Sequence, residues 1–365
     1  MAMDIPGSEI LLAAPLVAEQ FMSMDLYADD LTAAFSRLGG APSCARLMPA
    51  VPDRLSKIRR IWTRSHTYPA LVRKAAAANP GLLHVLDHSY AHLCRNHPRA
   101  VATCHDIAEY RVSQLTGRQF RHWRWRVEGL REAQHIIAIS SNTKTDLMEL
   151  LGIQGENISV VHYGVDPVFC PGNPALDRKA FPRLAGPELK ILHVGSNILR
   201  KNIPVLIEAL SQLKQAGLPF SLVKVGHQFP PEQAAQIKAA GLEGNVIHLG
   251  LRPTPELVAI YRLCDVFVLP STYEGFGRPI LEAQACGTSV ILSDSSCLAE
   301  VGQDAALYFP AADPAQLAAR LLQLSDAAER QSWTAKGIAN AAGFTWEAHA
   351  RGVRAVYASV LAAQH

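Results

Sequence analysis

Short apolar runs alternate with stretches of helical period along most of the chain. The apolar runs, rich in β-branched residues, predict buried strands at residues 9–14, 82–86, 100–104, 135–139, 189–194, 221–225, 246–249, 265–270 and 289–293. The helical period predicts helices at 25–38, 142–151, 203–216, 232–240, 255–264, 281–286 and 345–362. Ser140 or Ser141 is placed to cap the helix at 142–151. Strands that alternate with helices in this way indicate an α/β fold with parallel sheets.

The alternation loosens between residues 163 and 187, where five prolines and three glycines fall. This interruption predicts an N-terminal Rossmann-like domain at 1–168, a linker at 169–188 and a second Rossmann-like domain at 189–344. The helix pattern at 345–365 would then pack back on the first domain. A ligand site between the two domains is the default expectation.

Composition narrows the class of protein. The chain is 49% hydrophobic and 18% charged, as in soluble globular proteins, and its formal net charge of +3 gives no reason to expect a nucleic-acid partner. Seven cysteines without a Cys-x-x-Cys pair are typical of reduced thiols in a cytoplasmic protein. No apolar run approaches the ~18 residues of a membrane span, and the run at 10–17 follows Asp4 and Glu9 rather than a basic segment, so it is interpreted as a strand.

The segment 274–282 joins a predicted strand to a predicted helix. Parallel sheets bind ligands at this edge. Gly275 and Gly277 let a ligand approach the backbone, and the helix start at Pro279 leaves amides for a phosphate. Glu274 could accept hydrogen bonds from sugar hydroxyls, and Glu282 from a ribose. The spacing alone fits equally well a turn capped by Glu274 and a surface carboxylate at Glu282.

Two further segments follow strands. In 194–202, Arg200 and Lys201 are placed beside a helix start, where they could bind a diphosphate or simply be solvated. In 103–106, His105 stands at a strand end, where it could reach a ligand or be satisfied by the backbone.

A third polar cluster contains His84, Asp87, His88 and His92. A metal site is conceivable there, but the spacing matches no firm ligand pattern.

Taken together, these motifs resemble the retaining GT-B glycosyltransferases of the large family that includes glycogen-synthase-like enzymes and bacterial mannosyl- and glucosyltransferases. The likeness rests on Glu274-Gly-Phe-Gly-Arg-Pro-Ile-Leu-Glu-Ala283, Ala285-Cys-Gly-Thr-Ser-Val290, the Gly-x-x-x-x-Arg-Lys-Asn run from Gly195 to Asn202, Tyr163-Gly-Val-Asp166 and Glu300-Val-Gly-Gln-Asp-Ala-Ala306. It is strong over about residues 130 to 360 and weak over the first hundred.

The resemblance implies a GT-B fold, with two Rossmann-like domains facing across a cleft. The N-terminal domain would bind the acceptor, and the C-terminal domain would bind the nucleotide sugar. It also implies a retaining, metal-independent transfer of a hexose from a UDP- or GDP-sugar to a saccharide or lipid-linked acceptor, in polysaccharide, lipopolysaccharide or glycolipid assembly. No cofactor is expected. The implied catalytic residues are His105, Arg200, Lys201 and Glu274. The implied donor-binding residues are Gly195, Ser196, Asn197, Arg200, Lys201, Gly226, Leu251, Glu274, Gly275, Phe276, Gly277, Arg278, Pro279, Ile280, Leu281 and Glu282.

Two departures from the family pattern stand out. Ser196 occupies a position where many members carry arginine, and Arg200 could supply that charge. The family's glycine-rich loop after the first strand is replaced by residues 15–24, which contain no glycine, so the acceptor cannot be inferred from it.

Three alternatives stay open. A sugar phosphorylase or a nucleotide-sugar epimerase could use the same architecture, and so could a non-catalytic nucleotide-sugar-binding module. The basic, aromatic stretch Arg118–Arg126 could contact an anionic membrane, which would place a cytoplasmic protein peripherally on the inner face of the membrane. It could equally meet an anionic acceptor, or pack its tryptophans inward with its arginines solvated.

Overall fold

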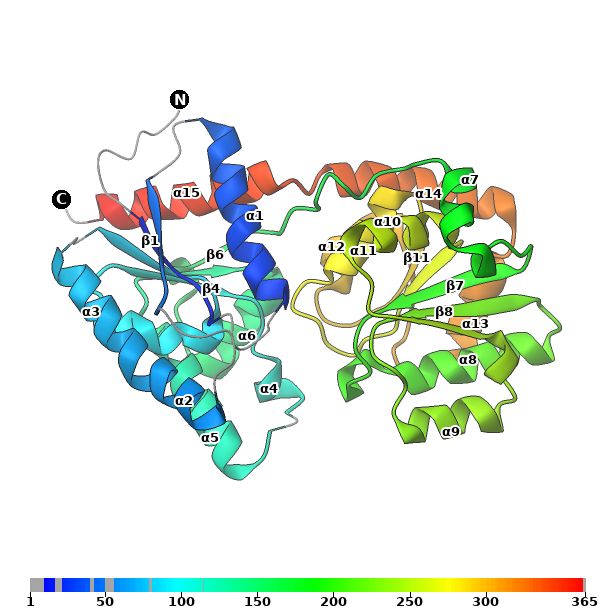
Figure 1. Cartoon of the computed structure of the whole chain (residues 1–365), viewed down its shortest axis with the longest axis horizontal. Helices are drawn as coiled ribbons and strands as arrows, with labels where there is room; N and C mark the ends of the chain where they lie inside the picture. The colour runs from blue at the N-terminus through cyan, green and yellow to red at the C-terminus, as the bar shows by residue number, and fades with distance from the viewer. Residues whose placement is uncertain are drawn as a thin grey trace. The chain divides into compact units, whose positions relative to one another are not determined.

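The computed structural model describes residues 10–16, 22–39, 43–49, 56–78, 81–113 and 115–363, without the side chains of residues 22–26 and 57. The chain divides into two units (Figure 1). The first unit contains residues 1–164 and 346–365, and the second contains residues 165–345. Among the described residues, every helix is too short or too polar to cross a lipid bilayer.

The first unit is built on a six-stranded sheet with the order β2-β1-β3-β4-β5-β6, in which all neighbouring strands are parallel. Its strands are β1 (Ile10–Ala13), β2 (Cys44–Leu47), β3 (Leu82–Val85), β4 (Ala100–Cys104), β5 (His135–Ala138) and β6 (Ile158–Val160). The strands β1, β3 and β4 are buried along their whole length, as expected of a parallel sheet covered on both faces.

Helices cover both faces of this sheet. On one face, α1 (Met22–Leu38) packs against α15 (Trp346–Ala362), so α15 belongs to the first unit (Figure 1). The other face is covered by α3 (Tyr68–Ala78), η3 (His88–Asn96), α5 (Gly117–Val127), η4 (Glu128–Glu132) and α6 (Ser141–Leu151). Shorter elements are α2 (Lys57–Trp62), the π-helical turn η2 (Thr63–Thr67), α4 (Ala108–Arg111) and η5 (Gly155–Asn157).

The second unit has a six-stranded parallel sheet with the order β12-β11-β10-β7-β8-β9. Its strands are β7 (Leu189–Val194), β8 (Phe220–Val225), β9 (Val246–Gly250), β10 (Val266–Leu269), β11 (Ser289–Ser293) and β12 (Leu307–Phe309). The chain runs outward from β7 to β9 and then returns to place β10 on the other side of β7. The strand order therefore reverses between β7 and β10, and ligands of open α/β sheets bind at this point.

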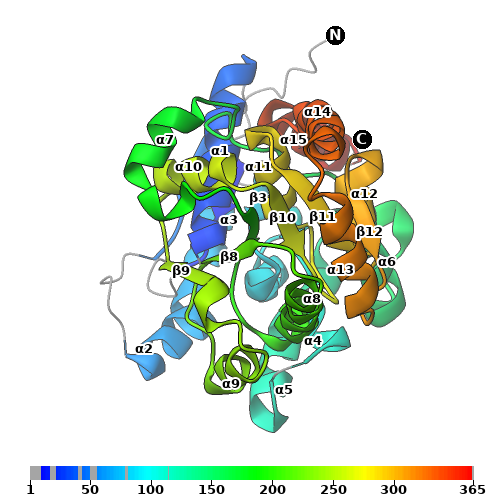
Figure 2. The same ribbon diagram turned by 90° about the vertical axis from the view of Figure 1, so that its right-hand side faces the viewer.

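Two groups of helices enclose the second sheet (Figure 2). One face packs on α8 (Ile203–Gln215), α9 (Pro231–Ala239) and α13 (Pro314–Gln323). The other carries α10 (Thr254–Leu263), α11 (Arg278–Cys286), α12 (Leu298–Gly302) and α14 (Ala327–Ala342). The remaining elements are α7 (Pro174–Ala180) and the 3-10 turns η6 (Pro182–Leu184), η7 (Leu199–Lys201), η8 (Glu243–Asn245) and η9 (Gln303–Ala305).

The segment 169–188 belongs to the second unit and is not an extended linker in structure, because it contains α7 and η6. Arg262 of α10 ties it down: its Nε donates to the Cys170 carbonyl at 2.7 Å, and its Nη1 lies 3.9 Å from the carboxylate of Asp177.

Local chemistry accounts for several predicted element ends. The hydroxyl of Ser140 accepts from the Thr143 amide at 3.1 Å and caps α6, and Gly152 ends α6 in the left-handed conformation. Pro279 lies in the first turn of α11, and Gly287, at φ 87°, ends that helix. The predicted α/β class is confirmed. The sequence pattern does not predict β2, β6 and β12. β2 and β6 are only partly buried and contain polar residues, and β12 has only three residues.

Candidate active site

Two loops meet where the strand order of the second unit reverses. One follows β7 and the other follows β10. The Thr272 amide donates to the Arg200 carbonyl at 2.8 Å, and the Asn202 side chain donates to the Pro270 carbonyl at 3.0 Å. Asn202 has a left-handed backbone, with φ 53°. Its side-chain bonds hold this conformation, and it fixes the direction in which Arg200 and Lys201 leave the loop.

Glu274 is the centre of this junction and is buried. Its carboxylate accepts from Lys201 Nζ at 2.5 Å, from Arg200 Nη1 at 3.0 Å and from the Ser271 hydroxyl at 2.7 Å. Burial by itself would raise the pKa of Glu274, but the charges of Lys201 and Arg200 hold that pKa below its usual value. The structure therefore brings Arg200 and Lys201 together with Glu274, which lies more than seventy positions further along the chain.

The Gly-Phe-Gly turn after Glu274 is fixed from below. The hydroxyl of Ser296 donates to the Glu274 carbonyl at 2.6 Å and accepts from the Glu274 amide at 3.2 Å. Phe276 is buried and meets Phe344 edge-on. Gly277 has φ 92°, and a Cβ there would lie 2.8 Å from the side chain of Ile280. This position therefore requires glycine.

Glu282 lies one turn into α11, and its carboxylate accepts from the Tyr261 hydroxyl at 2.9 Å. Burial raises its pKa, which the nearby Arg278 partly opposes. One hydrogen bond from a tyrosine leaves a carboxylate with further acceptor positions. Glu282 is thus held in a fixed orientation at the helix, beside Arg278.

The other predicted donor-binding positions follow the ends of β7, β8 and β9. Gly195 and Gly226 touch: the Gly226 amide bonds to the Gly250 carbonyl, and a Cβ on Gly226 would meet the Gly195 carbonyl oxygen at 2.1 Å. Asn197 donates to the backbone of His227 and Gln228. Leu251 follows at the next strand end, 61% exposed. These residues, together with 196 and 275–281, lie along one edge of the sheet.

Two residues that the sequence reasoning missed lie beneath this edge. His193, in β7, is fully buried; its Nδ1 donates to the Val268 carbonyl at 3.1 Å, and its Nε2 has no partner within the described part of the chain. A Cβ on Gly195 would lie 3.9 Å from this Nε2 and 3.9 Å from Lys201 Nζ. Both atoms therefore border the space beside Gly195. Burial, followed by the charge of Lys224, lowers the pKa of His193 to about 3, so Nε2 is an acceptor.

Lys224, in β8, adds a positive charge to the same place. Its side chain is fully buried, and Nζ donates to the Gly195 carbonyl at 2.6 Å and to its neighbour Val225 at 3.0 Å. Burial, followed by the charge of Lys201, lowers its pKa to about 8. No motif points to these two residues. The only sequence signal is a polar residue inside a strand that is mostly apolar.

His105 lies in the first unit, at the end of β4, and is fully engaged there. Its Nε2 donates to the Leu86 carbonyl at 2.8 Å, and its Nδ1 accepts from the hydroxyl of Tyr163. Burial lowers its pKa to about 4, although Asp87 opposes the shift. The backbone therefore satisfies part of this histidine, as one of the two sequence interpretations expects.

The neighbouring polar cluster does not converge on one point. His84 bonds to Tyr357 and Thr103, His92 bonds to the Arg64 carbonyl, and His88 lies 3.5 Å from Asp87. In the part of the chain that the structure describes, no three histidine, cysteine or acidic side chains are placed to hold a metal ion.

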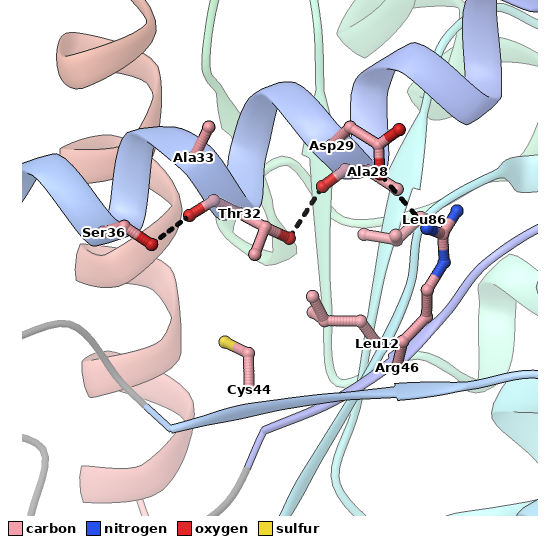
Figure 3. Close-up of a pocket in the computed structure, with 9 residues that line it drawn as sticks. All are labelled: Leu12, Ala28, Asp29, Thr32, Ala33, Ser36, Cys44, Arg46 and Leu86. Atoms are coloured by element: carbon pink, nitrogen blue, oxygen red, sulfur yellow. Dashed lines mark hydrogen bonds and ion pairs between the residues drawn. The ribbon is translucent and has the colours of Figure 1, made fainter.

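A pocket of about 390 Å³ lies between α1 and the strands β1 and β2 (Figure 3). The hydroxyls of Thr32 and Ser36 line it but donate to the backbone of their own helix. Arg46 and Asp29 form an ion pair of 3.1 Å beside it. The pocket thus offers a ligand mainly this exposed pair. Residues 17–21 of the loop expected to face the acceptor lie outside the described residues.

Two family models match the chain. Glycosyl transferases group 1 matches residues 177–339, and Glycosyltransferase Family 4 matches residues 34–169. The O-antigen chain mannosyltransferase B of Escherichia coli is 31% identical over 259 residues, which are 68% of this chain and 67% of that protein. The chain belongs to the group 1 glycosyltransferases.

Other relatives of this glycosyltransferase differ in extent. A D-inositol 3-phosphate glycosyltransferase of Frankia alni is 28% identical and aligns over 88% of this chain and 87% of its own length. The serotype-specific mannosyltransferase WbdA of Escherichia coli is also 28% identical, over 68% of this chain, but the match spans only 32% of WbdA.

Solved structures confirm the GT-B fold of the glycosyltransferase. A sucrose-phosphate synthase from Thermosynechococcus elongatus superposes with a TM-score of 0.80 at 21% identity, covering 98% of this chain and all of that one. Anabaena HepE in complex with UDP-glucose superposes with a TM-score of 0.73 at 20% identity, covering 97% of this chain and all of that one.

Proposed function

We propose that this glycosyltransferase moves a hexose from a UDP- or GDP-linked sugar to a hydroxyl of a saccharide or lipid-linked acceptor, with retention of the anomeric configuration. The product would belong to a polysaccharide, a lipopolysaccharide or a glycolipid. The observation that carries the proposal is the charge at the β7–β10 junction. There Arg200 and Lys201 pair with the single buried carboxylate of Glu274, and Lys224 adds a further positive charge near Lys201.

Three cations and one buried anion at this junction leave an excess of positive charge, which an anionic ligand would neutralise. A diphosphate beside Gly195 would meet Lys201, and the first amides of α11 point from a helix N-terminus, where phosphates bind well. The names of the relatives support a sugar donor: two are mannosyltransferases, and HepE is described with UDP-glucose.

In the proposed reaction the bond between the anomeric carbon and the diphosphate oxygen breaks, and the acceptor oxygen bonds to the same carbon from the same face. The acceptor proton passes to the departing phosphate. The products are a nucleoside diphosphate and a glycoside. The protein then contributes positioning and charge, since Arg200 and Lys201 stabilise the diphosphate as it leaves. The proposal needs neither a cofactor nor a metal ion, because these side chains would neutralise the leaving group.

Glu274, held by two cations, would accept hydrogen bonds from the sugar, and Glu282 from the ribose. The unpartnered Nε2 of His193 could accept a hydrogen bond from a sugar hydroxyl that also accepts from Lys201, because both atoms border the space beside Gly195. His105 is assigned to the sugar and acceptor side, in the first unit.

A panel of nucleotide sugars tests the donor. UDP-glucose, UDP-galactose and GDP-mannose are each added to the protein, and the melting temperature is recorded. A donor at a hundred times its Kd should stabilise the fold by about 2.7 kcal/mol. Release of nucleoside diphosphate on adding candidate acceptors, and the anomeric coupling constant of the product, would then establish transfer and retention. If no nucleotide sugar raises the melting temperature, the donor assignment is wrong.

The same assays separate the alternatives. A phosphorylase would release a free sugar 1-phosphate only when inorganic phosphate is present. An epimerase would convert the donor sugar without an acceptor. A binding module would be stabilised by the donor, would give no turnover and would tolerate loss of His105.

A further inference from the structure

The short helix α2 exposes large apolar side chains to solvent. Ile58 is 81% exposed, Trp62 62% and Ile61 39%. Residues 58, 61 and 62 are three and four positions apart, so they share one face of the helix. Among the described residues of the first unit, five large apolar side chains are this exposed, and three of them fall within these five positions. Such a concentration marks an interaction surface.

The same segment is strongly basic. Residues 57–67 contain four lysines and arginines and no acidic residue. Arg59 is exposed, and Arg60 and Arg64 are partly exposed beside the apolar face. A partner for this surface must therefore offer apolar contact and negative charge together.

Trp62 is held in place. Its ring stacks on His66 with a centroid distance of 4.2 Å and an interplanar angle of 14°. His66 lies in the π-helical turn that follows α2 directly. The stack fixes the indole while leaving most of it in contact with solvent, so little side-chain freedom would be lost on binding.

The basic face continues to α5. His92 donates to the Arg64 carbonyl at 2.9 Å, and its ring lies 5.4 Å from that of Trp125. Figures 1 and 2 show α2 and α5 at the same end of the first unit. The exposed Arg118 and Arg121 thus extend the charge of α2.

The helix α5 by itself is a poor apolar anchor. Trp123 is buried, and Arg126 is buried and donates to the Ser89 carbonyl at 2.7 Å. Trp125 is covered on one side by the Arg95 guanidinium, 5.1 Å from the ring centroid. Within Arg118–Arg126, the expected membrane contact can therefore supply charge, but the apolar part has to come from elsewhere.

We propose that α2 docks this protein on an anionic lipid surface. Ile58, Ile61 and Trp62 enter the boundary between headgroups and acyl chains, while arginines of α2 and α5 pair with the lipid phosphates. An anionic bilayer is the partner that offers both requirements at once, since tryptophan favours the membrane interface and each nearby basic residue adds attraction. The proposal concerns where the enzyme works and goes beyond which donor it uses.

Vesicle sedimentation tests it. The full chain is mixed with vesicles of phosphatidylcholine alone, or with vesicles that also contain about 30% of the anionic lipid phosphatidylglycerol. We expect binding to the anionic vesicles only, weakened by salt. The double variant Ile58→Ser/Trp62→Ser should lose at least tenfold in affinity, since two apolar side chains no longer leave water. The control Leu322→Ser removes another exposed apolar side chain, 52% accessible, from α13 in the second unit and should bind as the wild type does.

Fluorescence locates the contact. Vesicles with brominated acyl chains quench a tryptophan that enters the bilayer. The quenching should disappear in Trp62→Phe and persist in Trp125→Phe. The opposite result would make α5 the docking element and overturn the proposal.

Three further outcomes would also overturn it. The wild type could ignore anionic vesicles, or the Ile58/Trp62 variant could bind them normally. The protein could instead form a dimer that Trp62→Ser dissociates, which would make a second copy the partner. Stabilisation by a nucleotide sugar is measured on every variant. Because α2 lies in the first unit, this stabilisation should be the same in every variant. The test of membrane binding therefore stays separate from the test of the donor.

Discussion

The two units bury polar side chains by opposite means. At the β7–β10 junction of the second unit, opposite charges compensate one another, because the buried Glu274 is paired with Arg200 and Lys201. In the first unit the buried polar residues are mainly neutral histidines and tyrosines. Five of its histidines are buried, against one in the second unit, among the residues described. The cations of the second unit can thus exchange their partner for an anionic ligand, whereas the buried groups of the first unit are held by hydrogen bonds to one another.

In the first unit, a chain of hydrogen bonds from Tyr357 to His349 runs in one direction. Tyr357 donates to His84 Nδ1 at 2.6 Å, and His84 Nε2 donates to Thr103 at 2.8 Å. Thr103 then donates to Tyr27, and Tyr27 donates to His349 Nε2, each over 3.1 Å. This order follows from His349 Nδ1, which must donate to the His162 carbonyl.

The neutral histidines give each tyrosine hydroxyl in the chain an acceptor nitrogen. A proton added to either ring would turn that nitrogen into a donor and take the acceptor away from the tyrosine hydroxyl. Burial accordingly lowers the pKa of His84 to about 3 and that of His349 to about 4.

The largest effect should come from removing one cation of the ion-paired cluster in the second unit. Lys201→Ala should reduce turnover by about a thousandfold, or ~4 kcal/mol, because the leaving diphosphate loses a positioned cation. Release of nucleoside diphosphate would be measured beside the melting temperature. The control Lys214→Ala changes an exposed lysine of α8 and should keep full activity. Near-normal turnover in Lys201→Ala would refute the assigned role.

Acid should destabilise the first unit, whose buried histidines are neutral. The unfolded chain takes up protons near the ordinary histidine pKa of 6.5, whereas folded His84, His92, His105 and His349 do so only near pH 3 to 4. The unfolded state then binds more protons, so the free energy of unfolding falls as the pH drops below 6.5.

Between pH 6.5 and 5.5 the loss should be roughly 1 kcal/mol per histidine, or about 3 to 4 kcal/mol for the first unit. Hydrogen exchange of β3 and β4, corrected for intrinsic rates, should report it, while β7 and β10 lose less. Equal losses in both units would contradict the comparison.

The variant His105→Gln tests whether the second unit binds the donor while the first unit contributes to turnover. The variant keeps a polar side chain beside Tyr163 but removes the imidazole. We expect turnover to fall by about ten- to a hundredfold, or ~1.4 to 2.7 kcal/mol, with donor binding unchanged by calorimetry. A matching loss of donor affinity would show that the division is wrong.

The smallest effect concerns Lys224, whose pKa of about 8 lies close to physiological pH. As the pH rises through 8, Lys224 loses its charge, and affinity for a nucleoside diphosphate should fall a few-fold, or by about 1 kcal/mol. Titration calorimetry at pH 7 and pH 9 would measure this. Lys224→Met should bind more weakly and lose the pH dependence. The same dependence in the variant would assign it to another group.

The sequence predicts the second unit better than the first. Its strands except β12 match the apolar runs, and the structure joins Arg200 and Lys201 to Glu274 because all three lie at ends of adjacent parallel strands. His193 and Lys224 escape prediction for a physical reason. A buried polar residue in a strand gains its meaning from neighbours across the sheet, and one sequence does not state which strands are neighbours.

In the first unit the sequence places His105 at a strand end but not its partners. Tyr163 and the chain from Tyr357 to His349 come from segments as much as 322 residues apart, so no local pattern predicts them. The exposed face of α2 is missed for a different reason. A six-residue helix shows too little periodicity to reveal which of its side chains remain in water.

The insertion of one unit into the other has a consequence for translation. Residues 165–345 form a continuous segment whose ends adjoin, since the Val165 amide bonds to the Phe344 carbonyl at 3.0 Å. The first unit, in contrast, receives Tyr357 only after the whole second unit has left the ribosome. At typical rates this delay is roughly 10 to 40 seconds. During that time His84 lacks its Tyr357 partner and α1 lacks the helix against which it packs. The nascent first unit therefore depends on what shields that face until α15 arrives.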